Sequence, residues 1–249
     1  MKLNIKKFLF LTILLLLDVL GVKAQVLDAT NKPDHDDLPF YFGLTLGYNN
    51  SFLHIARSPD FLNPAVNTYN IRQIQPRGSS GLELGFIGTA HIIKRLELRI
   101  LPKLIIGGSK SLIYYYPRNG VDTMENIKLP TTLFSLPLQL KFNSDRIGNF
   151  RVYLFGGMKY DINLSANSDE YKRSRDLGLY PAPQFKSAIL GAEAGIGFNF
   201  YTPFAVISPE IRLGTTLGNN QVRDISNPYS NTIDQIKQRM LTFSINFEQ

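Results

Sequence analysis

The sequence predicts an all-β protein, an eight-stranded antiparallel up-and-down transmembrane β-barrel of the outer-membrane type with four long extracellular loops. Two observations predict this fold: apolar and polar residues alternate in eight stretches, and the links between the stretches are alternately long and short. Period-two alternation is typical of strands whose two faces meet different surroundings. Long outer loops and short periplasmic turns are the usual connections of antiparallel outer-membrane barrels.

The N-terminal residues predict export. Lys2, Lys6 and Lys7 precede an apolar run from Phe8 to Leu17, and Ala24 is a small residue before Gln25. This order is typical of a secretory signal peptide. A retained anchor is the alternative, but the run is short for a spanning helix of ~20 residues. We expect residues 1–24 to be a cleaved signal peptide, 25–38 a short periplasmic lead and 39–249 the barrel domain, integral to the outer membrane.

Composition excludes several other classes of protein. The net charge is +7, and without the first 24 residues 23 basic and 19 acidic side chains leave +4, which does not favour a nucleic-acid binder. The chain has no cysteine, so disulfide scaffolds, thiolate metal sites and cysteine nucleophiles are excluded. No later segment has the uninterrupted apolar length of a spanning helix.

Each predicted strand has one face of aliphatic and aromatic residues. The stretches run over Phe40 to Asn49, Leu82 to Phe86, Leu96 to Ile106, Phe134 to Phe142, Val152 to Ile162, Ala188 to Phe200, Ile207 to Leu217 and Leu241 to Phe247. Three prolines fall inside them, at Pro102, Pro137 and Pro209. Proline removes a hydrogen-bond donor, so we expect these positions at bulges or strand ends.

The links between the strands decide between barrel and sandwich, because a sandwich has no reason to place every long loop at one end. The long links are Asn50 to Gln75, Ser109 to Pro130, Asn163 to Phe185 and Gly218 to Lys237. The short links are Ala90 to Arg95, Asn143 to Asn149 and Tyr201 to Pro203. The alternation places all long loops at the same end of the sheet.

The second face of the strands carries charge. Its ten charged residues, five acidic and five basic, are Glu83, Glu97, Arg99, Lys103, Lys141, Lys159, Asp161, Glu193, Glu210 and Arg212. A Lys or Arg facing lipid at the midplane would cost roughly 2–4 kcal/mol. An eight-stranded barrel has room inside only for its own side chains, and unpaired buried ions are costly. We therefore expect these residues to form a paired charge network in a plugged lumen.

With the strands in this order, the chain resembles the PorT family of Bacteroidetes outer-membrane barrels. The strongest block runs from Leu133 to Ala166, LFSLPLQLKFNSDRIGNFRVYLFGGMKYDINLSA. Supporting blocks are FGLTLGYN at Phe42 to Asn49, RLELRILPKL at Arg95 to Leu104 and the closing LTFSINFE. The chain ends in Phe247-Glu248-Gln249, whereas many barrels end on the aromatic residue itself.

The resemblance implies a non-enzymatic component of the type IX (Por) secretion system, which exports cargo proteins and, in gliding relatives, is associated with motility. It implies other type IX secretion components as partners, together with outer-membrane lipid and lipopolysaccharide. Two alternatives stay open: a small outer-membrane porin and a lipid-modifying barrel enzyme.

The remaining candidates for chemistry are few. His35 lies in the acidic run Asp34-His35-Asp36-Asp37, which we interpret as solvated charge in a flexible lead rather than a cation site. Ser51 and His54 are close in sequence, but no carboxylate is placed to orient them as a nucleophile and base. We expect no catalytic residue, metal or cofactor. In the third long loop, Lys172, Arg173 and Arg175 are candidates to contact lipid phosphates or an acidic partner.

Overall fold

The computed structural model of the chain describes residues 30–249, except 108–109, 130, 168–182 and 224–226. The predicted signal peptide and the first residues of the lead lie outside the described residues. The elements are η1 (Pro33–Asp37), β1 (Phe40–Arg57), β2 (Gln73–Arg77), β3 (Ser79–Ile93), β4 (Leu96–Ile100), β5 (Lys103–Gly107), β6 (Lys110–Arg118), β7 (Val121–Leu129), β8 (Leu133–Asn143), β9 (Phe150–Asn163), η2 (Leu164–Asn167), β10 (Gln184–Phe185), β11 (Ala188–Tyr201), β12 (Val206–Thr216), β13 (Gln221–Val222), α3 (Pro228–Asn231) and β14 (Ile233–Glu248).

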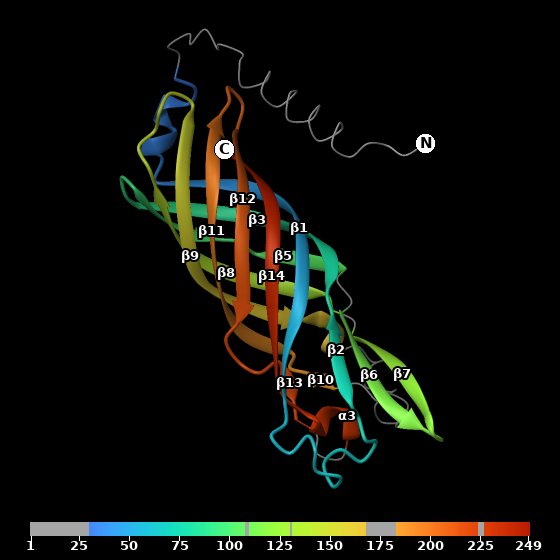
Figure 1. Cartoon of the computed structure of the whole chain (residues 1–249). Helices are drawn as coiled ribbons and strands as arrows, with labels where there is room; N and C mark the ends of the chain where they lie inside the picture. Colours follow the sequence, from blue (N-terminus) through green and yellow to red (C-terminus); the bar gives the residue numbers. More distant parts are fainter. Residues whose placement is uncertain (1–29, 108–109, 130, 168–182, 224–226) are drawn as a thin grey trace, which may run out of the picture. The chain divides into compact units, whose positions relative to one another are not determined.

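The main sheet closes into a ring of eight antiparallel strands, which confirms the predicted fold class (Figure 1). Its order is β1-β14-β12-β11-β9-β8, then β4 and β5 as two halves of one strand, then β3, which pairs with β1 again. Closure is made by β1, which pairs with β14 from Gly43↔Glu248 onward and with β3 from Phe40↔Ala90 onward. Because the first and last strands pair, the sheet has no free edge. None of the described helices is long and apolar enough to cross a membrane.

The three prolines sit where the hydrogen-bond ladder is interrupted, but only one is at a strand end. Pro102 lies between β4 and β5, and Pro137, inside β8, is opposite this gap and accepts a hydrogen bond from the Leu101 amide at 3.1 Å. Pro209 lies inside β12, at a position where the pairing with β11 is missing although its register continues. The expectation of bulges was therefore wrong for Pro137 and Pro209, whose missing donors face gaps in the neighbouring ladder and need no extra residue.

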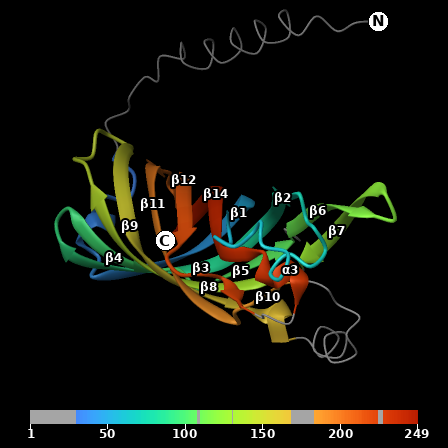
Figure 2. The same ribbon diagram turned by 60° about the horizontal axis from the view of Figure 1, so that its bottom comes forward.

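The long links also differ from the polar loops that the sequence suggests. β1 continues to Arg57, beyond the predicted end at Asn49, and the second link folds into the hairpin β6–β7, which pairs with β2. A short β10–β13 pair and α3 lie at the same end of the barrel (Figures 1 and 2). The sequence pattern does not predict these elements, because the apolar residues that pack together in them are far apart in the sequence.

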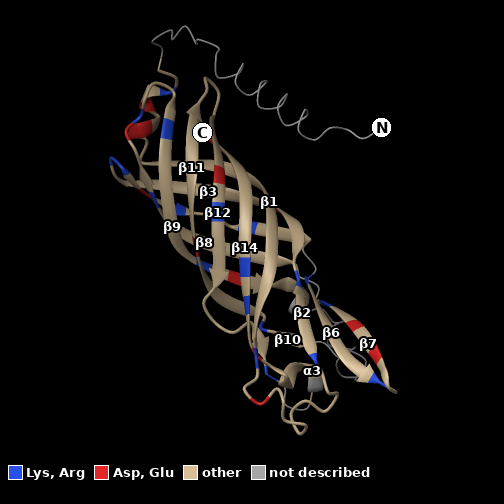
Figure 3. Ribbon diagram, viewed as in Figure 1, with Lys and Arg blue, Asp and Glu red and all other residues tan. Residues whose placement is uncertain are grey.

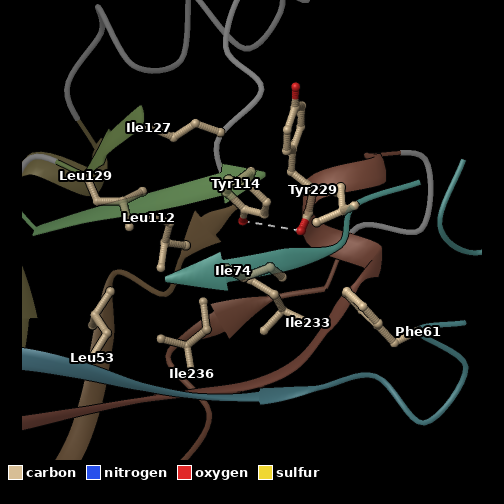
Figure 4. Packing of buried hydrophobic residues seen from close by; sticks show 11 residues of the cluster. Leu53, Phe61, Ile74, Leu112, Tyr114, Ile127, Leu129, Tyr229, Ile233 and Ile236 are labelled. Atoms are coloured by element: carbon tan, nitrogen blue, oxygen red, sulfur yellow. Dashed lines mark hydrogen bonds between the residues drawn. The ribbon is translucent and has the colours of Figure 1, made fainter. Parts of the chain in front are cut away.

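These links enclose a hydrophobic core of their own, which we call the cap (Figure 4). Leu112 and Tyr114 from β6 pack on Ile233 and Ile236 from β14, and the Tyr114 hydroxyl donates to the Tyr229 carbonyl at 3.4 Å. The other members of the cluster are Leu53, Phe61, Ile71, Ile74, Ile127, Leu129 and Tyr229. Burial raises the pKa of the Tyr114 hydroxyl well above its usual range, so the group stays a neutral hydrogen-bond donor. The cap covers the long-loop end of the barrel.

Candidate functional site: a charged lumen closed at both ends

All ten charged residues predicted for the lumen point inward and are buried. They lie on six strands of the ring, counting β4 and β5 as one, and each is at most 5% exposed. The alternate apolar positions on the same strands are exposed on the outer face, for example from Leu82 to Phe86 on β3 and from Leu136 to Phe142 on β8. Each of these six strands therefore has a charged inner face and an apolar outer face. Figure 3 shows where Lys, Arg, Asp and Glu lie along the ribbon.

The centre of the lumen holds two guanidinium groups around shared carboxylates. Glu210 accepts from Arg99 at 2.5 Å and from Arg212 at 2.9 Å, and Arg212 also contacts Glu83 at 3.0 Å. Arg212 and Glu210 are two residues apart on β12 and so share its inward face, while Arg99 and Glu83 come from β4 and β3. Four charges from three strands thus neutralise one another across the barrel.

A second set of contacts extends this cluster. The Lys103 ammonium lies 3.5 Å from Glu83 and 3.6 Å from Glu193, and Arg212 Nε lies 3.8 Å from Glu193. The Gln139 amide donates to Glu193 and its oxygen accepts from Arg99 Nε at 2.8 Å. Gln139, a neutral residue, thereby connects an acid and a base that do not touch directly.

Aromatic rings fill the space between the ions. The Arg99 guanidinium lies 4.8 Å from the ring centre of Phe155, and the Tyr153 hydroxyl donates to Glu210 at 2.8 Å. The absence of a side chain at Gly195 makes room for this ring, because a Cβ there would lie 2.5 Å from Phe155 Cζ. Gly47 has the same relation to Glu83, whose Cγ would be 2.6 Å from a Cβ. The inward glycines therefore accommodate the large side chains opposite them.

Near the short turns, a separate cluster is built around Glu97. This carboxylate lies 3.1 Å from the Lys141 ammonium and 3.0 Å from His91 Nε2, and it accepts from the Tyr41 hydroxyl at 2.8 Å. Glu248 lies 3.9 Å from the same lysine. Lys141 also lies 4.4 Å from the ring centre of Tyr153, which joins this cluster to the central one.

Near the long loops, Lys159 and Asp161 form a third cluster. Their ion pair is 2.6 Å long, and Asp161 also accepts from the Ser135 hydroxyl at 2.5 Å. Beyond this cluster, the buried Lys110 begins β6 in the cap. Burial, with some repulsion from Lys159, lowers the pKa of the Lys110 ammonium to about 7. Lys110 is therefore easier to deprotonate than an ordinary lysine.

At the short-turn end, the lead closes the opening. Residues 33–37 form the 3-10 helix η1, and the Asp36 carboxylate accepts two hydrogen bonds from the Arg151 guanidinium, at 2.7 and 2.9 Å. The His35 ring is buried, with its centre 4.6 Å from that of Tyr41 and 5.8 Å from that of Tyr201. The interpretation of this segment as solvated charge was wrong for His35 and Asp36, which aromatic packing and an ion pair hold, whereas Asp34 and Asp37 are exposed.

Sequence reasoning missed several members of the lumen. Tyr41, His91, Tyr153, Gln139 and Glu248 are buried or nearly so and bond to the predicted charges. They stand at inward alternate positions, so the period-two pattern that found the ions was able to find them as well. The segment from Asn31 to Asp37, by contrast, has no strand pattern that would place it at the barrel mouth.

A family model described as the outer membrane protein beta-barrel domain matches residues 24–221 of the chain. The chain belongs to this family of outer-membrane β-barrels. Its localisation to the outer membrane follows from the family and from the closed ring of strands.

Solved structures of other outer-membrane barrels are similar at a lower level. OprG from Pseudomonas aeruginosa is 11% identical, with 83% of this chain and 95% of that chain covered and a TM-score of 0.40. Neisserial surface protein A is 11% identical, with 83% and 96% covered and a TM-score of 0.41. The outer membrane protease OmpT from Escherichia coli is 10% identical, with 84% and 95% covered and a TM-score of 0.44. Likenesses at this level carry no argument about function. No curated protein matches.

The structure does not bring together the Ser51 and His54 that the sequence offered as a nucleophile and base. Ser51 points inward and donates to the Ser79 carbonyl at 3.4 Å, whereas His54 is exposed on the outer face of β1. The two candidate catalytic residues therefore lie on opposite faces of one strand. Within the described residues, no group of three or more His, Asp or Glu side chains is placed to hold a metal ion. The predicted loop contacts Lys172, Arg173 and Arg175 lie outside the described residues.

Proposed function

We propose that this barrel is a non-enzymatic outer-membrane component of the type IX protein secretion system, needed for cargo export and, in gliding cells, for motility. The resemblance to the PorT family supports the proposal. Its strongest block, Leu133 to Ala166, covers β8, the short turn and β9, which carry Gln139, Lys141, Tyr153, Lys159 and Asp161 of the lumen.

The filled lumen supports a role in secretion in which the barrel does not itself conduct the cargo. Three clusters of ion pairs occupy the interior, the cap covers one end and η1 the other. A protein cargo needs an open passage, which this interior does not have. The barrel therefore acts through its surfaces, with the cap facing the exterior and η1 facing the periplasm, against other secretion components and outer-membrane lipid. Nucleic acid is not among the proposed partners.

A clean deletion of the gene tests the proposal. We expect cargo proteins that carry the type IX C-terminal signal to disappear from the medium and to accumulate inside the cell, measured by comparing the secretomes of deletion and parent strains. Complementation with the wild-type gene restores release. Normal cargo release in the deletion strain would reject the proposed role, whatever its effect on the membrane.

The two alternatives lack support from the geometry. A porin needs a water-filled path, and the charged side chains along this lumen are bonded to one another. A lipid-modifying enzyme needs a nucleophile within hydrogen-bond reach of a base, and Ser51 and His54 face opposite sides of β1. Altered lipid A in cells that overproduce the barrel would support the enzyme and count against our proposal.

A further inference from the structure

Charged side chains are rare on the outer face of the ring strands that the structure describes. On the described parts of the eight ring strands, Lys237 and Arg239 of β14 are the only Lys, Arg, Asp or Glu side chains at regular outward alternate positions. Two other charged residues, Arg57 and Asp234, are exposed beside the irregularity where the register between β1 and β14 shifts. Lys237 and Arg239 face away from the lumen, and neither makes an ion pair or side-chain hydrogen bond with the described residues. The register places His54 of β1 directly opposite Lys237, which adds a third nitrogen-bearing side chain.

Arg239 and Lys237 follow the last apolar outward position of β14 on its long-loop side. On β14 the outward positions from Phe247 to Leu241 are apolar, and Arg239 is the next one toward the long-loop end. On the two neighbouring strands the residues across from Arg239 are Phe52 and Thr215. A basic side chain is costly at the bilayer midplane but costs only about 0–1 kcal/mol near the interface. Arg239 thus stands at the long-loop edge of the apolar outer surface, where a basic side chain is tolerated.

Arg239 also borders a groove in the outer wall of about 430 Å³. The groove is hollow because Ala192 and Ala194 are small, and Phe52 and Leu213 flank it. A larger groove of about 700 Å³ lies nearer the short-turn end, among the apolar outward residues, and has no Lys or Arg among its lining residues. Of these two grooves, only the first has a cationic side chain, Arg239, among its lining residues, and Lys237 stands at the next outward position of β14.

We propose that this groove is a binding site for a phosphate-bearing lipid of the outer leaflet. The phosphate contacts Arg239 and Lys237, and one acyl chain of the same molecule lies along Ala192 and Ala194. A guanidinium group and an ammonium group are the side chains that bind phosphate most strongly. A soluble anion would need no apolar groove beside the charges, and a neutral lipid would need no charges beside the groove. The combination therefore identifies an anionic amphiphile. This site does not depend on the proposed role in secretion.

Lipid A, the phosphorylated acyl anchor of lipopolysaccharide, is the probe for the test. Purified, delipidated barrel in detergent is incubated with lipid A, and the bound fraction is counted by native mass spectrometry. We expect Arg239→Gln to weaken binding at least about tenfold, which corresponds to loss of one charge-assisted hydrogen bond. Lys94→Gln removes a positive charge from the short turn at the other end and is expected to bind like the wild type.

Two further measurements distinguish the contribution of the phosphate to binding from that of the acyl chain. Dephosphorylated lipid A should bind the wild type and Arg239→Gln equally weakly. Ala194→Phe, which fills the groove on the lipid side without touching the lumen, should also lose lipid A. Folding of each variant is checked by its shift in mobility on unheated gels.

Equal lipid A binding by Arg239→Gln and wild type would overturn the site. So would Arg239-dependent retention of inorganic phosphate alone at the same concentration, because that result would show a site for a free anion rather than for a lipid.

Discussion

Glu210 is the residue on which the centre of the lumen depends. It accepts from both Arg99 and Arg212, and Arg99 has no other carboxylate within ion-pair distance among the described residues. Arg99 is 0% exposed, so the charge left by losing Glu210 has no access to water. Removing one partner of a buried ion pair costs far more free energy than replacing both partners by apolar residues, because the remaining ion stays desolvated.

We therefore expect Glu210→Gln to lower the free energy of unfolding by about 3–5 kcal/mol. The amide keeps the shape of the carboxylate but removes its charge. Asp122→Asn is the matched control, since Asp122 pairs with Arg72 at 2.9 Å on the exposed surface, and such pairs contribute about 0–1 kcal/mol. Urea unfolding in detergent micelles measures both variants. Losses of similar size in the two would show that the lumen pair is not desolvated as we infer.

At the scale of elements, η1 is held by a histidine that must remain neutral. Burial, followed by the nearby Lys141, lowers the pKa of His35 to about 4; Asp36 and Glu97 act in the opposite direction, and Lys32 adds the smallest, lowering effect. In the undocked segment the pKa returns to its ordinary 6.5. The undocked state therefore binds more protons between these values, and protonation favours undocking. Docking is strongest above pH 6.5 and weakens as the pH falls toward 4.

Hydrogen exchange checks this prediction. Backbone amides of residues 31–38, corrected for the pH dependence of intrinsic exchange, should be less protected at pH 5 than at pH 7.5. His35→Phe keeps an aromatic ring between Tyr41 and Tyr201 but has no proton to gain, so its protection should not change over this range. If both proteins lose protection together, a group other than His35 controls the docking of η1.

The cap is a second element with its own stability. Leu112 is fully buried among the eleven residues of the cluster. Leu112→Ala should cost about 2–5 kcal/mol of packing, and the loss should fall on the cap because the ring strands are joined by their own hydrogen bonds. Limited proteolysis should then cleave near the β6–β7 hairpin while the barrel stays intact. Val121→Ala, at a 67% exposed position of the hairpin, should leave the pattern unchanged. A barrel that unfolds as a whole in Leu112→Ala would show that cap and ring are one cooperative unit.

At the scale of the whole molecule, the sequence predicts features that recur from strand to strand but not tertiary contacts that occur only once. Apolar residues alternate with polar or small ones on every ring strand, and on six strands the polar positions include charges, as Glu97 and Arg99 do between Leu96, Leu98 and Ile100, so the sequence predicts the ring and the ten lumen charges. Which ions pair depends on how strands far apart in sequence face each other, and the Arg99–Glu210 pair is separated by 111 residues. The cap core and the docking of His35 depend on single tertiary contacts, which have no period in sequence.

The filled interior leads to the last prediction, that the barrel does not conduct ions. The lumen clusters bridge strands across the ring, as in the contact of Lys103 with both Glu83 and Glu193, and an ion can pass only by displacing such pairs. Wild-type barrel in planar bilayers should therefore show no sustained single-channel current. Removing residues 31–38 should not open it, because η1 covers only the mouth and the ion pairs lie behind it. A general porin in the same bilayers provides the positive control. Steady current steps from the wild type would mean that the ion pairs separate in the membrane, whereas steps only after removal of 31–38 would identify η1 as the barrier.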